Sequence, residues 1–117
     1  MLICFQAGAQ TSAVAVADSL YALGNYASAI NAYAKMGDKK ANLQIARAYN
    51  AIGNYDKAIA QYTAVLENNP EFELARFELG KLLLKTKDFG PAMEMFQVLV
   101  SSEGQNPEYF YYLGRVY

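Results

Sequence analysis

The sequence contains no histidine and no tryptophan, and Cys4 is its one cysteine. This inventory excludes an internal disulfide, a zinc site built from cysteine and histidine, and a histidine-based catalytic triad. No phosphate loop, nucleotide-binding fingerprint or nucleophile paired with a base occurs in the sequence either. We therefore expect a protein that is not an enzyme and that needs no metal or other cofactor.

An excess of charge of one sign is also missing. The chain has 10 Lys and Arg against 11 Asp and Glu, a net charge of −1, which gives no broad attraction to nucleic acid or to an anionic membrane. No run of residues approaches the ~20 apolar positions that a membrane span needs. With 54% hydrophobic residues in 117, the chain has enough apolar material for a continuous core, and we expect one soluble domain.

The first ten residues, MLICFQAGAQ, form an apolar leader. Its short apolar run and the small residues at 7–9 are typical of the end of a secretory signal, but the basic segment of such a signal is missing. Two interpretations stay open. A signal remnant would place the protein in a bacterial periplasm or cell envelope, whereas a leader that packs on the first repeat is compatible with the cytoplasm.

Three segments of the sequence repeat one pattern: GNYASAINAY at 24–33, GNYDKAIAQY at 53–62 and KDFGPAMEMF at 87–96. Each contains a turn residue, a cap, an aromatic residue, an alanine, an aliphatic residue and a second aromatic residue. The interval from the second segment to the third also separates Ala46 from Gly80 and Gly80 from Gly114. The first interval is shorter, because Gly37 and Asp38 end one helix and begin the next early. Such a constant period is the signature of a helical repeat protein.

Each repeat is predicted to be a pair of antiparallel helices. Ala46 and Ala58 are small, which allows two helix axes to approach within about 8–10 Å. Tyr62 lies one helical turn beyond Ala58 and is expected to fill the space beside that contact. Asn25, Asn54 and Asp88 are each placed to cap a helix. We therefore predict seven helices with turns near residues 24, 37, 53, 69, 87 and 104.

These features, together with Pro70 at the end of the second repeat, resemble the tetratricopeptide repeat family over residues 11–117. Departures are the missing tryptophan, Lys87 in place of a turn glycine, Gly104 where a proline would recur, and the shortened first repeat. The resemblance implies an all-α, right-handed superhelix of about three helix–turn–helix repeats, at about 11–38, 39–72 and 73–106, plus the first helix of a fourth at 107–117. It also implies a scaffold that binds other proteins.

In this family the first helix of each repeat lines a concave face, and the resemblance places the partner groove there. Arg47, Lys81 and Arg115 recur with the period of the repeat as a row of cations, beside an apolar row. We expect a partner with acidic and apolar residues; the alternative is a solvated helix face, neutralised by Glu73 and Glu78. The predicted groove residues are Val14, Asp18, Tyr21, Leu43, Arg47, Asn50, Phe77, Lys81, Leu84, Tyr111 and Arg115.

Some tetratricopeptide domains clamp the acidic tails of heat-shock chaperones through lysine, asparagine and arginine residues. The matching places here hold other residues, and we do not expect this co-chaperone role. These places are Val14, Asp18, Gln44, Leu74 and Glu78.

The C-terminal segment predicts an apolar open end. Tyr109, Phe110, Leu113 and Tyr117 begin a fourth repeat, and no second helix follows to cover them. An exposed apolar patch of this kind drives association. The alternative function is therefore structural self-assembly through this end, either in a homo-oligomer or as part of a longer repeat array, unless Tyr117 folds back locally.

Overall fold

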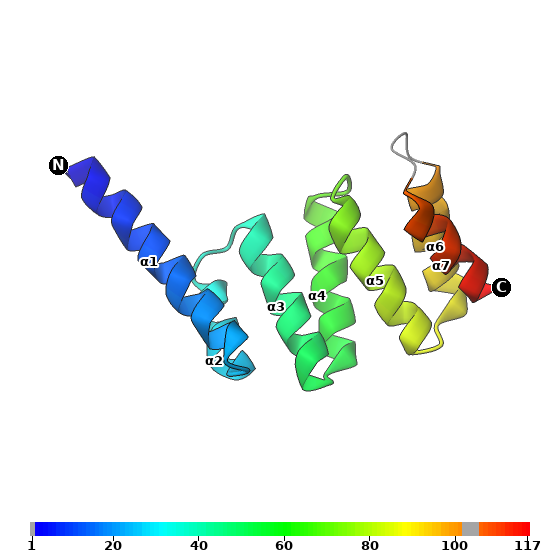
Figure 1. The fold of residues 1–117 in the computed structure, drawn as a ribbon, viewed down its shortest axis with the longest axis horizontal. Coiled ribbons are helices and arrows are strands. Elements are labelled where there is room, and N and C mark those ends of the chain that lie inside the picture. Colours follow the sequence, from blue (N-terminus) through cyan, green and yellow to red (C-terminus); the bar gives the residue numbers. More distant parts are fainter. Residues whose placement is uncertain (1, 102–105) are drawn as a thin grey trace. The chain divides into compact units, whose positions relative to one another are not determined.

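The computed structural model describes the backbone of residues 2–101 and 106–117, and side chains from residue 12 onward over the same ranges. This part of the chain contains seven helices and no strand, which confirms the all-α prediction (Figure 1). The helices are α1 (Leu2–Ala22), α2 (Tyr26–Ala34), α3 (Lys39–Ile52), α4 (Tyr55–Asn68), α5 (Glu73–Lys85), α6 (Phe89–Val100) and α7 (Pro107–Val116). Over the described residues, no helix is both long and apolar enough to cross a membrane.

The chain divides into two compact units, residues 1–58 and 59–117, with the boundary inside α4. In the first unit, α1 packs against α2 and α2 packs against α3. Ala17 on α1 and Ala29 on α2 are fully buried, and they form one core cluster with Tyr33, Ala41 and Ile45. Small residues at these positions allow the close helix contact that the repeat pattern predicts.

The second unit contains most of α4 together with α5, α6 and α7, and each of the last three contacts the other two. Gly80 on α5 faces the ring of Phe96 on α6, and a Cβ added at Gly80 would lie 2.8 Å from the Phe96 Cζ atom. No side chain larger than hydrogen fits there without a shift. Phe96 and Ala92, one turn apart on α6, are both fully buried.

The turns lie where the sequence predicts them, near residues 24, 37, 53, 69 and 87; the turn expected at 104 lies outside the described residues. Gly24, Gly37 and Gly53 have φ values of 80°, 72° and 88°, a left-handed conformation that favours glycine. Lys87 adopts the same conformation with φ 65°. The turn at residue 87 therefore forms although the sequence has lysine there in place of glycine.

Two of the predicted helix caps are wrong. Asn25 and Asp88 occupy the N-cap positions of α2 and α6, but neither side chain accepts a hydrogen bond from its helix. Their ψ angles are 68° and 71°, whereas Asp38 is extended at 168° and accepts from the Ala41 N–H. The carboxylate of Asp88 accepts instead from the Thr86 hydroxyl. The predicted cap at Asn54 is confirmed by a 3.3 Å bond from the Lys57 N–H.

The backbone of the apolar leader continues into the first helix, since α1 begins at Leu2. The side chains of residues 1–11 lie outside the described part. The two interpretations of the leader therefore both stay predictions.

Candidate functional site

The predicted groove residues of the first unit lie on α1 and α3. Val14 is 44% exposed and Asp18 is also exposed, while Arg47 and Asn50 are half-buried. Leu43 is only 4% exposed, because α3 also buries Ala41, Ile45, Ala46 and Ala48 and is therefore covered on more than one side. Leu43 is a core residue, and its burial disfavours the predicted contact with a partner.

A chain of hydrogen bonds links two of these groove residues through the core. The Tyr33 hydroxyl donates to Asp18, the Gln44 amide donates to the Tyr33 oxygen at 3.3 Å, and Arg47 donates to the Gln44 carbonyl at 2.8 Å. Burial, reinforced by the bond to Asp18, raises the pKa of Tyr33 to about 12. Asp18 and Arg47 are therefore held in place by the protein itself, which the sequence alone does not reveal.

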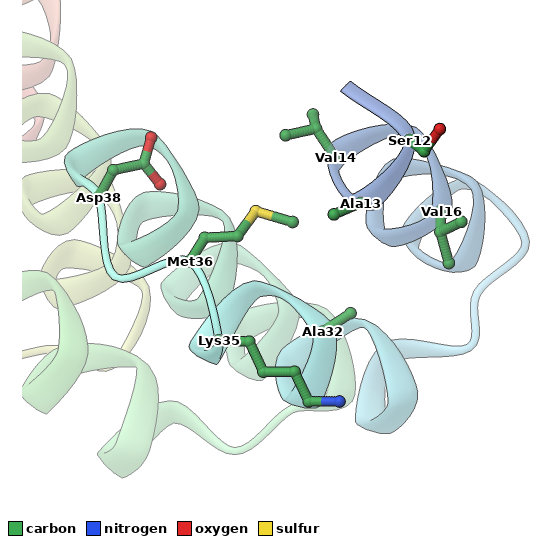
Figure 2. Close-up of a pocket in the computed structure, with 8 residues that line it drawn as sticks. All are labelled: Ser12, Ala13, Val14, Val16, Ala32, Lys35, Met36 and Asp38. Carbon is green, nitrogen blue, oxygen red and sulfur yellow. The ribbon is translucent and has the colours of Figure 1, made fainter. Parts of the chain in front are cut away.

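A pocket of about 840 Å³ opens beside the short second helix (Figure 2). Figure 2 shows the side chain of Met36 pointing toward Ala13 and Val14 of α1. Helix α2 has 9 residues, compared with 14 in α4 and 12 in α6, so it ends early and leaves part of α1 uncovered. The lining residues are Ser12, Ala13, Val14, Val16, Ala32, Lys35, Met36 and Asp38.

In the second unit, two predicted groove cations lie over aromatic rings. The Lys81 ammonium is 4.6 Å from the centre of the Phe77 ring and 5.9 Å from that of Tyr112. The Arg115 guanidinium is 5.6 Å from the Tyr112 ring and 6.0 Å from that of Tyr111. Both cations are exposed, and neither pairs with a carboxylate in the part of the chain that the structure describes. We call these five residues the cation–aromatic face.

The rings of this face continue into the core. Phe77 is 8% exposed and contacts Tyr109, Tyr112 and Phe96 at centroid distances of 5.1, 5.4 and 6.2 Å. Phe77 thus supports the face from below, and its burial disfavours the open groove position predicted for it. Tyr111 is 63% exposed and Leu84 is half-buried. The face offers a partner two cations and the outer ring of Tyr111.

Tyr112 also belongs to this face, although no motif of the sequence predicts it there. Its ring stacks on Phe96 at 5.7 Å with an interplanar angle of 16°. The signal that locates it is the period of the repeat: Tyr62 donates to Glu78 at 2.9 Å, across 16 residues, and Phe96 meets Tyr112 across the same interval. At this position of the repeat, the tyrosine hydroxyl of Tyr62 donates to a carboxylate, whereas Phe96, which has no hydroxyl, stacks on an aromatic ring.

The residues predicted to form the open end differ in their exposure. Phe110 is 48% exposed and Tyr117 is 81% exposed, while Leu113 is half-buried. Tyr109, which the sequence predicts to be uncovered, is only 7% exposed, because it packs on Phe77 and donates a 3.4 Å hydrogen bond to Glu73. Burial, with Glu73 nearby, raises the pKa of Tyr109.

The residues described by the structure include no group of three or more cysteine, aspartate and glutamate side chains suited to a metal ion.

Paired antiparallel helices with small residues at their contacts define a helical repeat protein. The family model of the tetratricopeptide repeat matches residues 43–109. The chain belongs to the tetratricopeptide repeat family. None of the curated protein sequences compared with it matches.

Solved structures share this fold. MamA from Desulfovibrio magneticus RS-1 is 20% identical, with a TM-score of 0.81 over 92% of this chain, which spans 63% of the MamA chain. The Yersinia enterocolitica type III secretion chaperone SycD, in complex with a peptide of the translocator YopD, is 19% identical, with a TM-score of 0.75 over 93% of this chain and 87% of that chain. The second domain of human RPAP3, in complex with an HSP70 peptide, is 18% identical, with a TM-score of 0.76 over 91% of this chain and 92% of that chain.

Proposed function

We propose that the protein is an interaction scaffold that binds a partner segment carrying both acidic and apolar side chains. The observation that carries this proposal is the cation–aromatic face of the second unit. Lys81 and Arg115 are exposed, their described contacts are with rings, and the outer ring of Tyr111 lies beside Arg115. A carboxylate of the partner would meet two cations that form no ion pair within the described residues, and an apolar side chain would rest on Tyr111.

The ring contacts keep these cations in position. A cation over an aromatic ring gains about 0.5–1 kcal/mol at an exposed site, so the long side chains of Lys81 and Arg115 are partly ordered before a partner arrives. Ordering in advance lowers the entropic cost of binding. SycD and the RPAP3 domain, which share the fold, were each solved with a bound peptide, and this supports a peptide as the partner of the present chain.

The proposal is tested with short synthetic peptides that alternate leucine with glutamate, and with matched peptides that alternate leucine with lysine. Fluorescence anisotropy should show binding of the acidic peptides, with an association rate that falls as salt rises. Lys81→Glu should slow association of the acidic peptide and reduce its salt dependence. Lys87→Glu makes the same change of charge in a turn away from the face and serves as the control.

Both variants must keep wild-type helicity and melting, so that a binding defect is not mistaken for unfolding. Equal affinity for the acidic and basic peptides would contradict the proposal. So would equal losses in Lys81→Glu and the control, because the effect would then follow net charge alone.

A second candidate function is self-association through α7. The observation that favours it is the exposure of Phe110 and Tyr111 on α7 and of Tyr117 directly after this helix. Contiguous exposed apolar side chains of this size are typical of interaction surfaces. Sedimentation of the 117-residue chain over a range of concentrations tests it: a monomer throughout would contradict this second function and leave the peptide proposal unaffected.

A further inference from the structure

We propose that the pocket beside α2 is a docking site for an amphipathic helix of a partner protein, which inserts apolar side chains into the pocket and places a carboxylate at Lys35. This inference goes beyond the functions proposed above, because the pocket lies in the first unit and shares no residue with the cation–aromatic face or with α7. Three features carry it: the early end of α2, the apolar lining and an exposed cation at the edge of the pocket.

The second helix of the first repeat ends earlier than its equivalents. Counted from the second aromatic residue of the repeated pattern, α2 continues only from residue 33 to 34, whereas α4 continues from 62 to 68 and α6 from 96 to 100. At about 1.5 Å of rise per residue, α2 lacks about 4.5 Å of helix relative to α6 and about 7.5 Å relative to α4. The first repeat therefore leaves open a place where the other two repeats continue as helix.

The apolar side chains at this place are also missing or less covered in the first repeat. Gly37 stands at the position of Leu66, which is 8% exposed. Met36 is half-buried, but it stands at the position of Val65 and Leu99, which are 3% and 1% exposed. The second and third repeats bury apolar residues here, whereas the first repeat leaves space for an apolar side chain from elsewhere.

The pocket itself is suited to such side chains. Five of its eight lining residues are alanine, valine or methionine. Its volume of about 840 Å³ lies within the ~300–1,000 Å³ of pockets that hold ligands, so it accepts more than one side chain. Figure 2 shows Met36 in the middle, with Asp38 on one side and Ala13 and Val14 of α1 on the other. A methionine side chain is flexible and adapts to the shape of an apolar partner.

The two charged residues of the pocket differ in what they contact. The carboxylate of Asp38 accepts a hydrogen bond from the Ala41 N–H, as the N-cap of α3. Lys35 is exposed and forms no ion pair within the described residues. A carboxylate of the partner would pair with Lys35, whereas a partner cation would meet a like charge. The pocket therefore favours apolar side chains with a carboxylate beside them.

A helix is the occupant that this place favours. In the second and third repeats, the residues at this place belong to the last turns of α4 and α6, so a helical turn is the shape that the repeat accommodates here. A helix presents apolar residues at three- and four-residue steps along one face, with room for a carboxylate next to them. Docking of such a face into an apolar groove is a common mode of recognition.

Binding of a designed helix to the full 117-residue chain tests the proposal. The probe is a labelled, alanine-rich helical peptide with two leucines one turn apart and a glutamate on the same face. Fluorescence anisotropy should show binding, and the NMR signal of the Met36 methyl group should shift. Met93 and Met95 lie on α6 in the second unit, and their unchanged signals are the internal control.

Two alanines of α1 provide a matched pair of variants. Ala13 lines the pocket and Ala15 does not. Both residues are exposed, so leucine at either position should leave the melting temperature unchanged. Ala13→Leu should weaken binding of the probe by at least about tenfold, because the new side chain occupies the space of a leucine anchor. Ala15→Leu should leave the affinity unchanged.

A second pair of variants tests the charge. Lys35→Glu should weaken binding of the glutamate probe by up to about fivefold, the usual value of an exposed ion pair, and should favour a probe with lysine in place of the glutamate. Lys57→Glu makes the same change of charge outside the pocket and should leave the preference for the glutamate probe in place. Equal changes in the two variants would overturn the pairing with Lys35.

The remaining outcomes separate this inference from the functions proposed above. Absence of binding, equal binding to Ala13→Leu and Ala15→Leu, or an unshifted Met36 signal overturns the pocket as the site. Equal binding of a probe with proline at its centre overturns the helix as the occupant. Self-association that is lost in Ala13→Leu assigns the pocket to a second copy and overturns a partner protein. Lys81→Glu, which changes the cation–aromatic face, should leave binding of the helical probe unchanged.

Discussion

Gly80 and Gly114 stand at equivalent places in successive repeats, yet their surroundings differ. The Phe96 ring lies against Gly80, whereas an added Cβ at Gly114 would meet open space. Within the described residues, Phe96 therefore limits the size of the side chain at position 80, whereas no neighbour limits it at position 114. Substitution by alanine separates these two roles.

Gly80→Ala should lower the free energy of unfolding by about 1–3 kcal/mol, because its Cβ would overpack the contact with Phe96. Gly114→Ala should instead raise the stability of the monomer by up to about 1 kcal/mol, through the better helix propensity of alanine. Urea unfolding measured at a low protein concentration gives both values. A loss of stability in both variants would contradict the open space at Gly114.

Tyr33 predicts a dependence of stability on alkaline pH. Its pKa is raised from 10 to about 12 in the folded chain, so the folded state holds this proton more tightly than the unfolded state. The contribution is therefore complete below pH 10 and is lost as the pH rises toward 12. Denaturant unfolding at several pH values should show a steeper decline in this range for the wild type than for Tyr33→Phe. Parallel curves for the two proteins would contradict the shift.

At the scale of the elements, the ends of the helices are set by backbone conformation as much as by residue type. Asp38, Asn25 and Asp88 all stand at N-caps, but only the extended backbone of Asp38 brings its carboxylate to an N–H of the helix. A sequence pattern identifies the place of a cap. It does not give the ψ angle that decides whether the side chain reaches the helix.

Asp38→Ala should therefore destabilise the chain by about 1 kcal/mol, the usual value of a side-chain cap. Asn25→Ala should cost clearly less, since the Asn25 side chain makes no capping bond to lose. The difference between the two melting temperatures is the measurement. Equal losses would mean that Asn25 also caps its helix in solution.

At the scale of the whole molecule, the helices, their order and their turns could be predicted because a repeat shows the same local signal several times. The exposure of the groove residues could be predicted less well. Leu43 and Phe77 were placed there by their period, but contacts with neighbouring helices bury both side chains. Tyr112 was missed because its role depends on Phe96, a partner on another helix. The pocket beside α2 could not be predicted, because it depends on how much of α1 the short helix α2 covers, and no single sequence motif gives that.

The two proposed functions share residues, and this predicts competition between them. Tyr111 belongs to the cation–aromatic face and is also one of the exposed side chains through which self-association is proposed. The apparent affinity for an acidic peptide should therefore fall as the protein concentration rises, because pairing covers part of the face. In Phe110→Asp, which should weaken association through the exposed residues of α7, the affinity should be independent of concentration. A wild-type affinity that is equally independent would show that the two surfaces do not overlap.

The ring contacts between successive repeats bear on how such a chain gains or loses length during evolution. Tyr62 finds its acceptor, Glu78, 16 residues later and beyond the turn at 69–72, so a cut in that turn would leave a buried hydroxyl without its partner. Between Tyr33 and Gln44 the interval is 11 residues. The short repeat is therefore shorter between the ring and its partner, and the contact is kept, although here the Tyr33 oxygen accepts from the Gln44 amide. We therefore expect this chain to tolerate a change in the length of a repeat when both ends of this contact are preserved.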